Sequence, residues 1–236
     1  MANPYFQFKR FTVWHDKCAM KVGTDGVLLG AWAKIEGRPR TLDIGTGTGL
    51  IALMLAQRGA ARIDAIDIDR DACLQAESNI SRSPFAGQIN VFHTSLAEYA
   101  PKTPSYDLIV SNPPYFVDSL KCPDGKRTLA RHAETLPLTE LLQGSRQLLA
   151  DKGRLSLILP FERRDALLDA ARWESLFPEE EAHVISRQGL RPKRLLITLT
   201  THSTDSPHTT QLIIEDETCH YTDAFKALVQ DFYLKM

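Results

Sequence analysis

The nine residues 42–50, LDIGTGTGL, decide the fold of this chain. The short apolar run at residues 40–44 predicts a buried strand, and residues 50–58 predict a helix. Between them, glycines at positions 45, 47 and 49 let the backbone turn tightly and approach a ligand closely. The first N–H groups of the helix lack partners within it and favour a polar ligand there. Leu50 stands where a dinucleotide fingerprint needs its third glycine, and no Gly-Lys-Ser/Thr follows, so the turn disfavours a hydride-transfer cofactor and excludes a P-loop.

Strand-like and helix-like segments alternate outward from this turn. Further strands are expected at residues 63–67, 89–93 and 106–111 and from Gly153, and further helices at 69–81, 138–150 and 163–177. Repeated βα units predict a mostly parallel sheet with helices on both faces, which binds its ligands at the carboxyl ends of the strands. Residues 182–186 and 195–201 leave no room for a helix between them, so they predict an antiparallel hairpin at the sheet edge. A β-like run at 211–215 and an amphipathic helix at 222–233 follow.

The segment before the glycine turn is an extension of this core. Apolar residues alternate there in two registers around Lys9 and Arg10, which predicts one strand with a break. Thr24 or Asp25 is expected to cap a short helix that runs to Ala33. The length of 236 residues suits a single domain, made of an extension (1–39), a Rossmann-like core (40–201) and a C-terminal strand and helix (202–236).

Composition narrows the possible function classes. With 28 basic and 29 acidic residues, the net charge of −1 excludes a broadly basic protein that coats nucleic acid, although not a local basic patch. No apolar run approaches the ~20 residues of a membrane span, and the N-terminus lacks the apolar region of a signal peptide. The four cysteines form no CxxC pair, which is typical of free thiols in a reducing compartment and indicates the cytoplasm. The histidines show no metal-ligand spacing, so no metal site is expected.

An acidic residue ends the second strand of the core. Asp67 lies 18 residues after Gly49, where a carboxylate can accept hydrogen bonds from both hydroxyls of a ribose. Ile68 beside it can lie on an adenine face. The plainer interpretation is that Asp67 only caps the next helix, but Asp69 is better placed for that role. The glycine turn and Asp67 together predict a pocket for a nucleoside.

The tetrapeptide NPPY, residues 112–115, follows the strand at 106–111. Pro113 and Pro114 have no N–H, so the local backbone offers carbonyl acceptors, to which Asn112 adds an amide oxygen. Two such acceptors can hold both hydrogens of a planar amino group, favour a tetrahedral nitrogen and stabilise the positive charge that grows during methylation. Tyr115 can stack on a flat ring. The alternative is an ordinary turn, since Asn-Pro and Pro-Pro are turn formers.

These motifs resemble the class I S-adenosylmethionine-dependent amino-methyltransferases, and the chain ends narrow the resemblance. Residues 8–33, with the unusual string HDKCAMKVGTDG, and residues 221–234 are similar to the bacterial tRNA1(Val) adenine-N6 methyltransferases, which modify the adenine just 3′ of the anticodon. The resemblance implies a seven-stranded sheet of order 3-2-1-4-5-7-6 with an antiparallel strand at the end, and S-adenosylmethionine as cofactor. No obligate protein partner or membrane contact is expected. The residues implied at the cofactor are Lys21, Thr24, Asp43, Gly45, Gly47, Asp67, Ile68, Ser95 and Asn112.

The resemblance also implies the chemistry of the NPPY segment. Asn112 and Pro113 would hold the target amino group, and Tyr115 would stack on the adenine. One position departs from the family, because Leu96 stands where an acidic contact to the cofactor's adenine amino group is expected. Ser95 or a backbone group is the expected substitute.

A tRNA substrate needs local cations, since the net charge does not supply phosphate contacts globally. Three basic clusters are candidates, and the first two are expected near the active edge. They comprise Lys9, Arg10, Lys17 and Lys21; Lys121, Lys126, Arg127, Arg131 and His132; and Arg187, Arg191, Lys193 and Arg194. The RNA contacts are assigned to Lys9, Arg10, Lys121, Lys126, Arg127 and Arg131.

Three other functions share these motifs. A ribosomal guanine-N2 methyltransferase and a protein glutamine-N5 methyltransferase use the same core, although the second typically carries a separate N-terminal helical domain, for which about 39 residues are too few. A catalytically inactive methyltransferase fold that binds RNA is the third alternative. The intact glycine turn and NPPY segment argue against it.

Overall fold

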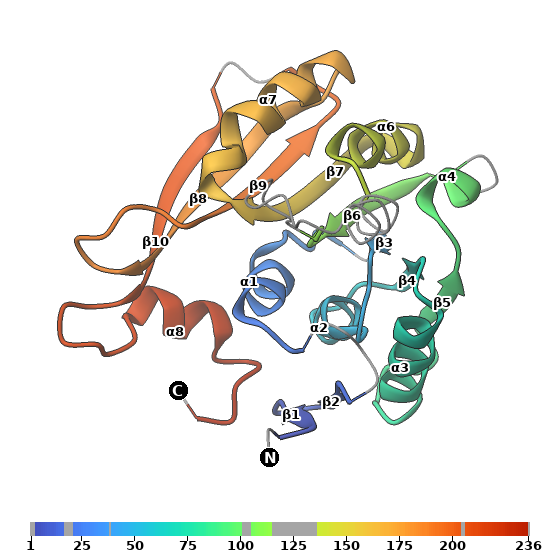
Figure 1. Ribbon diagram of the computed structural model, residues 1–236, viewed down its shortest axis with the longest axis horizontal. Coiled ribbons are helices and arrows are strands. Elements are labelled where there is room, and N and C mark those ends of the chain that lie inside the picture. The colour runs from blue at the N-terminus through green and yellow to red at the C-terminus, as the bar shows by residue number, and fades with distance from the viewer. Residues whose placement is uncertain are drawn as a thin grey trace, which may run out of the picture.

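The chain folds around a twisted eight-stranded sheet of order β10-β8-β9-β7-β6-β3-β4-β5 (Figure 1). The computed structural model describes residues 3–16, 21–37, 39–100, 105–114, 136–203 and 206–235. The central strands are β3 (Arg40–Ile44), β4 (Arg62–Asp67), β5 (Ile89–His93), β6 (Tyr106–Ser111) and β7 (Leu149–Pro160). The remaining strands of the sheet are β8 (Phe177–Arg187), β9 (Arg194–Thr200) and β10 (His208–Glu215). β3 to β7 pair in parallel, and β9 lies antiparallel between β7 and β8.

The expected order is confirmed for seven strands, but the strand count is eight rather than seven. β10 pairs in parallel with β8, from His208 opposite Glu180 to Glu215 opposite Arg187. Without it, β8 would present a row of unpaired backbone groups, which proteins commonly cover. The run expected at 211–215 is therefore the end of a longer strand that extends the sheet.

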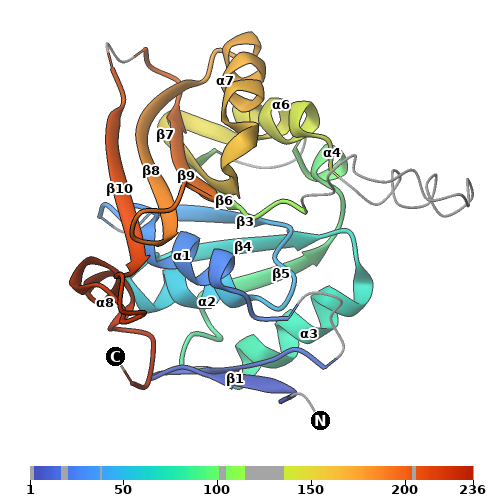
Figure 2. The same ribbon diagram turned by 60° about the vertical axis from the view of Figure 1, so that its left-hand side comes forward.

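Helices cover both faces of the sheet, as the βα alternation predicts (Figure 2). One core lies under α1 (Thr24–Trp32), α2 (Leu50–Gln57), α3 (Arg70–Ser81) and α8 (Asp223–Val229). The other lies under α4 (Leu96–Tyr99), α6 (Leu138–Leu148) and α7 (Arg164–Trp173), which follows the 3-10 turn η2 (Phe161–Arg163). Both cores are rich in Leu and Ile, to which the first adds Ala, Val and Phe and the second adds Tyr; burial of this apolar surface is the main force that holds the layers together.

The N-terminal extension is a two-stranded antiparallel hairpin, not one broken strand. β1 (Tyr5–Gln7) pairs with β2 (Thr12–Trp14), and the turn between them carries Lys9 and Arg10. The side chain of Asn79 on α3 bonds the backbone N–H and the carbonyl of Trp14. Phe8 forms a bridge with Tyr233, and Lys9 donates its N–H to the carbonyl of Phe232, so the turn of this hairpin lies beside the C-terminal segment.

Two local expectations are wrong. Gly23 caps α1, with no side-chain hydrogen bond at that position, while the carboxylate of Asp25 binds Arg194 instead. The helix expected to reach residue 177 ends at Trp173, because β8 begins at Phe177. Within the described residues, no helix is long and apolar enough to cross a membrane.

Candidate active site

Three carboxyl ends of strands meet at the glycine turn. Ile44, the last residue of β3, lies opposite Ile66 of β4 and Ser111 of β6. The hydroxyl of Ser111 donates a hydrogen bond of 2.8 Å to the carbonyl of Ile44 and ties the two strand ends together. Because Gly45 and Asn112 follow these paired residues directly, the glycine turn and the NPPY segment leave the sheet at adjacent points.

The glycine turn needs its glycines for two different reasons. Gly47 has a φ of +56°, which side-chain-bearing residues rarely adopt, and a Cβ there would meet nothing within 4 Å. Gly49 has a φ of +80°, and its Cβ would lie 3.3 Å from the Cβ of Ala76, so α2 packs closely against α3 at this point. The turn is therefore open toward its outer side at Gly47 and tightly packed at Gly49.

Asp67 connects this turn to the end of β4. Its Oδ2 accepts the N–H of Gly47 at 2.8 Å, and its Oδ1 accepts the N–H of Asp69 at 2.9 Å. Each oxygen retains a lone pair, so the carboxylate can still accept a hydrogen bond from each hydroxyl of a ribose diol. Burial raises the pKa of Asp67, although the two N–H bonds oppose the rise. The neighbouring carboxylate, Asp69, caps α3 through the N–H of Asp71, so the helix-capping role belongs to Asp69.

Ile68 presents an apolar surface beside Asp67. Its side chain is 61% exposed, which is unusual for isoleucine and leaves a face that a flat ring could cover. A ring nitrogen of His93 lies 3.0 Å from the carbonyl of Ile68 and fixes the backbone between β4 and β5. The positions of Gly47, Asp67 and Ile68 fit the ribose and base of a nucleoside.

Asp43, in β3, holds the glycine turn through a hydrogen bond with Thr46. It is fully buried, and its Oδ2 accepts the hydroxyl of Thr46 at 2.7 Å. Burial raises its pKa to about 7, although hydrogen bonds from Thr46 and from the backbone of Ala52 oppose the rise. A buried carboxylate is costly to ionise, so cationic charge at this edge would stabilise the ionised form.

Position 96, where leucine stands in place of the expected acidic residue, lies just after β5. Leu96 is only 5% exposed and packs in the core beneath α6, where a Cβ on Gly144 would lie 2.7 Å from it. Ser95 is half-buried and caps α4 in a reciprocal pair with Glu98. The side chain of Leu96 therefore lies in the core, while Ser95 beside it is a polar residue at this edge of the sheet.

The NPPY segment is described only in part. Asn112 and Pro113 are half-buried and Pro114 is exposed, directly after β6. Tyr115 and the cluster of Lys121, Lys126, Arg127 and Arg131 lie outside the described residues. The structure thus brings Asn112 and Pro113 to the edge that carries Gly45, Gly47 and Asp67.

The front of the site is formed by the start of α1. Lys21 and Thr24 are exposed, and a Cβ on Gly26 would lie 3.1 Å from Leu50, the first residue of α2. The carboxylate of Asp25 binds the Arg194 guanidinium at 2.8 Å, and so joins α1 to the start of β9. The first turn of α1 is therefore next to the glycine turn.

Lys9 and Arg10 do not lie at this edge, contrary to expectation. The ammonium of Lys9 donates to the carbonyl of Gln230 at 2.6 Å, and Arg10 lies 5.2 Å from the ring centre of Phe85, which precedes β5. Both contacts are on the side of the sheet where the parallel strands begin. Lys9 also lines a surface hollow of about 720 Å³ together with Lys226 and Lys235.

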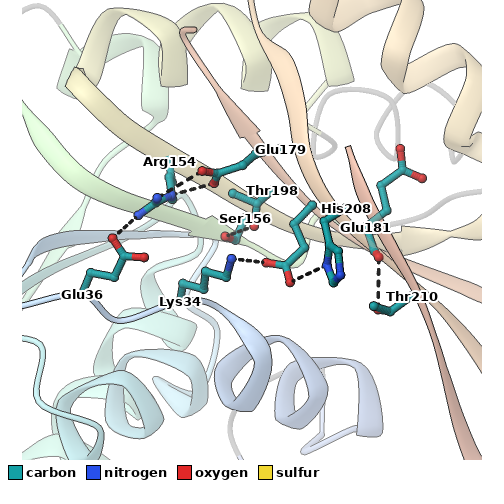
Figure 3. Close-up of polar contacts among 10 residues, drawn as sticks. Lys34, Glu36, Arg154, Ser156, Glu179, Glu181, Thr198, His208 and Thr210 are labelled. Atoms are coloured by element: carbon teal, nitrogen blue, oxygen red, sulfur yellow. Dashed lines mark hydrogen bonds and ion pairs between the residues drawn. The ribbon is translucent and has the colours of Figure 1, made fainter. Parts of the chain in front are cut away.

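A separate network of charges lies at the side of the sheet where the parallel strands begin, opposite to their carboxyl ends (Figure 3). Arg154 binds Glu179 and Glu36 at 2.7 Å each, and Lys34 binds Glu180 at 2.9 Å. These pairs join the segment after α1 to β7 and β8 and serve the fold rather than the site. Among the described residues, no group of His, Cys, Asp and Glu side chains is arranged to hold a metal ion.

Comparisons with known proteins agree with this geometry. The sequence model of the family described as "Methyltransferase small domain" matches residues 22–164. A protein from Parabacteroides distasonis named tRNA1(Val) (adenine(37)-N6)-methyltransferase is 63% identical over 237 residues, which cover all of both chains. A Bacteroides fragilis protein of the same name is 50% identical, again over all of both chains.

The solved structures agree at the level of the fold. A predicted O-methyltransferase from Agrobacterium tumefaciens superposes with a TM-score of 0.70, covering 88% of this chain and 96% of its own, at 18% identity. At that identity the likeness concerns the fold alone.

Proposed function

This chain belongs to the methyltransferase small-domain family and, within it, to the tRNA1(Val) (adenine(37)-N6)-methyltransferases, and we propose on that basis that it transfers a methyl group from S-adenosylmethionine to N6 of adenine 37 in tRNA1(Val). One structural observation supports the proposal above the others. Asn112 leaves β6 beside the turn whose Gly47 is held by Asp67, so acceptors for an amino group stand next to a site for a nucleoside.

The cofactor is assigned to the carboxyl edge of β3 and β4. Asp67 would accept the ribose hydroxyls, Ile68 would cover the adenine, and Ser95 would replace the missing acidic contact. Gly45 and Gly47 would let the backbone approach the ligand, with Asp43 behind them, while Lys21 and Thr24 would face the methionine carboxylate. The cofactor supplies an electrophilic methyl group on a positively charged sulfur.

The residues after β6 would prepare the target nitrogen. The Asn112 amide oxygen and the Pro113 carbonyl would accept the two hydrogens of the adenine amino group, with Tyr115 stacked on the ring. As the N–C bond forms and the S–C bond breaks, these acceptors stabilise the positive charge on nitrogen. The proton then leaves to water, so no general base with a tuned pKa is required.

A tRNA substrate determines which contacts, partners and cell compartment we expect for the enzyme. An anticodon-loop adenine is already unpaired and needs only to be splayed outward. Lys121, Lys126, Arg127 and Arg131, which follow NPPY, stay candidates for RNA contact, and we propose no metal and no obligate protein partner. A tRNA substrate and scattered cysteines favour the cytoplasm.

The experiment is methyl transfer from radiolabelled S-adenosylmethionine to unmodified tRNA, followed by nucleoside analysis and mapping of the label. N6-methyladenosine at position 37 of tRNA1(Val), formed about 10²-fold more slowly by the Asn112→Ala variant, supports the proposal. Label in N2-methylguanosine of ribosomal RNA, or in a protein glutamine, would replace the substrate and keep the fold. Cofactor binding with no transfer to any of these would favour an inactive RNA-binding protein.

A further inference from the structure

We propose that the turn between β8 and β9 forms, through Arg191 and Lys193, the surface that binds phosphates of the tRNA substrate. We call these two residues the basic rim. The inference rests on the proposed function, because it takes tRNA as the substrate. It adds a binding surface that the sequence patterns did not favour over the two other basic clusters.

The basic rim lies at the edge that carries the candidate site. β7 ends at Pro160, opposite Arg194, so the β8–β9 turn stands at the same edge as the carboxyl ends of the parallel strands. Arg194 binds Asp25 in the first turn of α1, and the next residue, Gly26, packs on Leu50 directly after the glycine turn. A short chain of contacts therefore connects the basic rim to the glycine turn.

The charges of the rim are not neutralised by the fold. Residues 187–194 contain four cations and no acidic residue. Two of these cations are engaged, Arg187 with Glu215 and Arg194 with Asp25. Arg191 and Lys193 are exposed and form no ion pair with the described part of the chain. In a chain of net charge −1, such a local excess of positive charge is complementary to a phosphate backbone.

The backbone of the turn is fixed before any ligand arrives. Lys193 donates its N–H to Val184 at 2.9 Å and accepts that of Phe161 at 3.1 Å, while Leu190 bonds back to Arg187. Gly189, with a φ of +82°, provides the left-handed residue that the turn requires. The backbone of the turn therefore loses less conformational entropy when phosphates bind, which favours phosphate binding at this turn.

The other described cluster fits less well. The ammonium of Lys9 donates a hydrogen bond to the carbonyl of Gln230. The hollow that Lys9 lines with Lys226 and Lys235 lies on the side of the sheet where the parallel strands begin, away from the glycine turn. Arg10 lies over the Phe85 ring before β5. Cations on that side cannot hold phosphates adjacent to an adenine placed at Asn112.

The test compares two double variants with equal loss of charge. Arg191→Ala with Lys193→Ala removes two cations from the rim, and Arg62→Ala with Lys152→Ala removes two from the opposite edge of the sheet. Arg62 opens β4 and Lys152 lies near the start of β7, and both are exposed. Arg62 lies 3.8 Å from the Asp64 carboxylate, which keeps its closer ion pair with Arg40 at 3.0 Å in the variant. Binding of unmodified tRNA is measured between about 50 and about 300 mM KCl, because each phosphate contact contributes between about 0.7, the value for single strands, and about 0.9, the value for a B-form duplex, to the salt slope.

We expect the rim variant to lower the salt slope by about 2 and to raise KM for tRNA several-fold. Its kcat and its affinity for S-adenosylmethionine should stay within about twofold of wild type, which a misfolded variant would not maintain. The opposite-edge variant should match wild type in all four quantities.

A rim variant with the wild-type slope and KM, or equal losses in both double variants, would overturn the inference. Absence of tRNA methylation by the wild-type protein would instead overturn the proposed function, and the two failures are thus distinguishable.

Discussion

Replacing Asp67 by alanine tests the core of the site, because this residue joins the glycine turn to the end of β4. In the structure its two oxygens accept the N–H groups of Gly47 and Asp69 at 2.8 and 2.9 Å. With cofactor bound, the remaining lone pairs would accept two ribose hydroxyls. The variant removes all four bonds, so it should weaken the cofactor site and loosen the turn.

The size of the effect follows from the kind of bond that is lost. A hydrogen bond to a charged group contributes about 1.5–3 kcal/mol. Asp67 is half-buried, so the lower value applies to each of the two ribose bonds. Their sum of about 3 kcal/mol corresponds to about 10²-fold in the dissociation constant of S-adenosylmethionine.

Asp69→Ala is the matched control, since it removes a carboxylate two residues away from the same segment. Asp69 caps α3 through Asp71, and loss of such a cap typically costs about 1 kcal/mol of stability. Cofactor affinity is measured by titration calorimetry, and stability by urea unfolding without ligand. The control should lose stability and keep its affinity.

The opposite pattern would refute this reasoning. Binding of S-adenosylmethionine by Asp67→Ala within about threefold of wild type would mean that the ribose lies elsewhere. Loss of affinity in Asp69→Ala alone would move the ribose to that carboxylate.

Three further predictions concern the same edge. Asn112→Ala should lower kcat by about 10² through loss of one preorganised acceptor, with cofactor affinity unchanged; a parallel loss of affinity in calorimetry would make Asn112 structural. Ser95→Asp should keep the cap of α4 and tighten cofactor binding. Leu96→Asp should lower the free energy of unfolding by about 3 kcal/mol or more, because it buries a charge. Equal unfolding midpoints for the two variants would contradict the placement of Leu96 in the core. Burial raises the pKa of Asp43 from 3.8 to about 7, so the folded protein holds a proton that the unfolded chain releases, and the free energy of unfolding should fall as pH rises from about 4 to about 7. In urea unfolding, Asp43→Asn should flatten this dependence and be more stable than wild type at pH 8 by at most about 4 kcal/mol. A pH profile of the variant as steep as that of wild type would show that another group titrates.

The sequence alone determined the parts of this protein that depend on neighbouring residues. The strands at 89–93 and 106–111 have the expected bounds, because short apolar runs between turn residues encode them locally. The capping role of Asp69 was predictable for the same reason, since a cap acts within its own turn of helix. The motifs at 42–50, 67 and 112–115 also indicated the chemistry, because each directly follows or ends an apolar strand; β3, β4 and β6, which carry them, are neighbours in the sheet.

Tertiary structure decided what depends on residues far apart in the chain. The pairing of β10 with β8, the burial of Leu96 under α6 and the position of Lys9 beside Gln230 follow from packing between distant segments, which no local pattern encodes. Asp25 and Arg194 are 169 residues apart, yet their contact brings the β8–β9 turn to the start of α1. Local periodicity fixes which segments are strands and helices, whereas the sharing of one buried surface between layers decides which charged loops meet at the site.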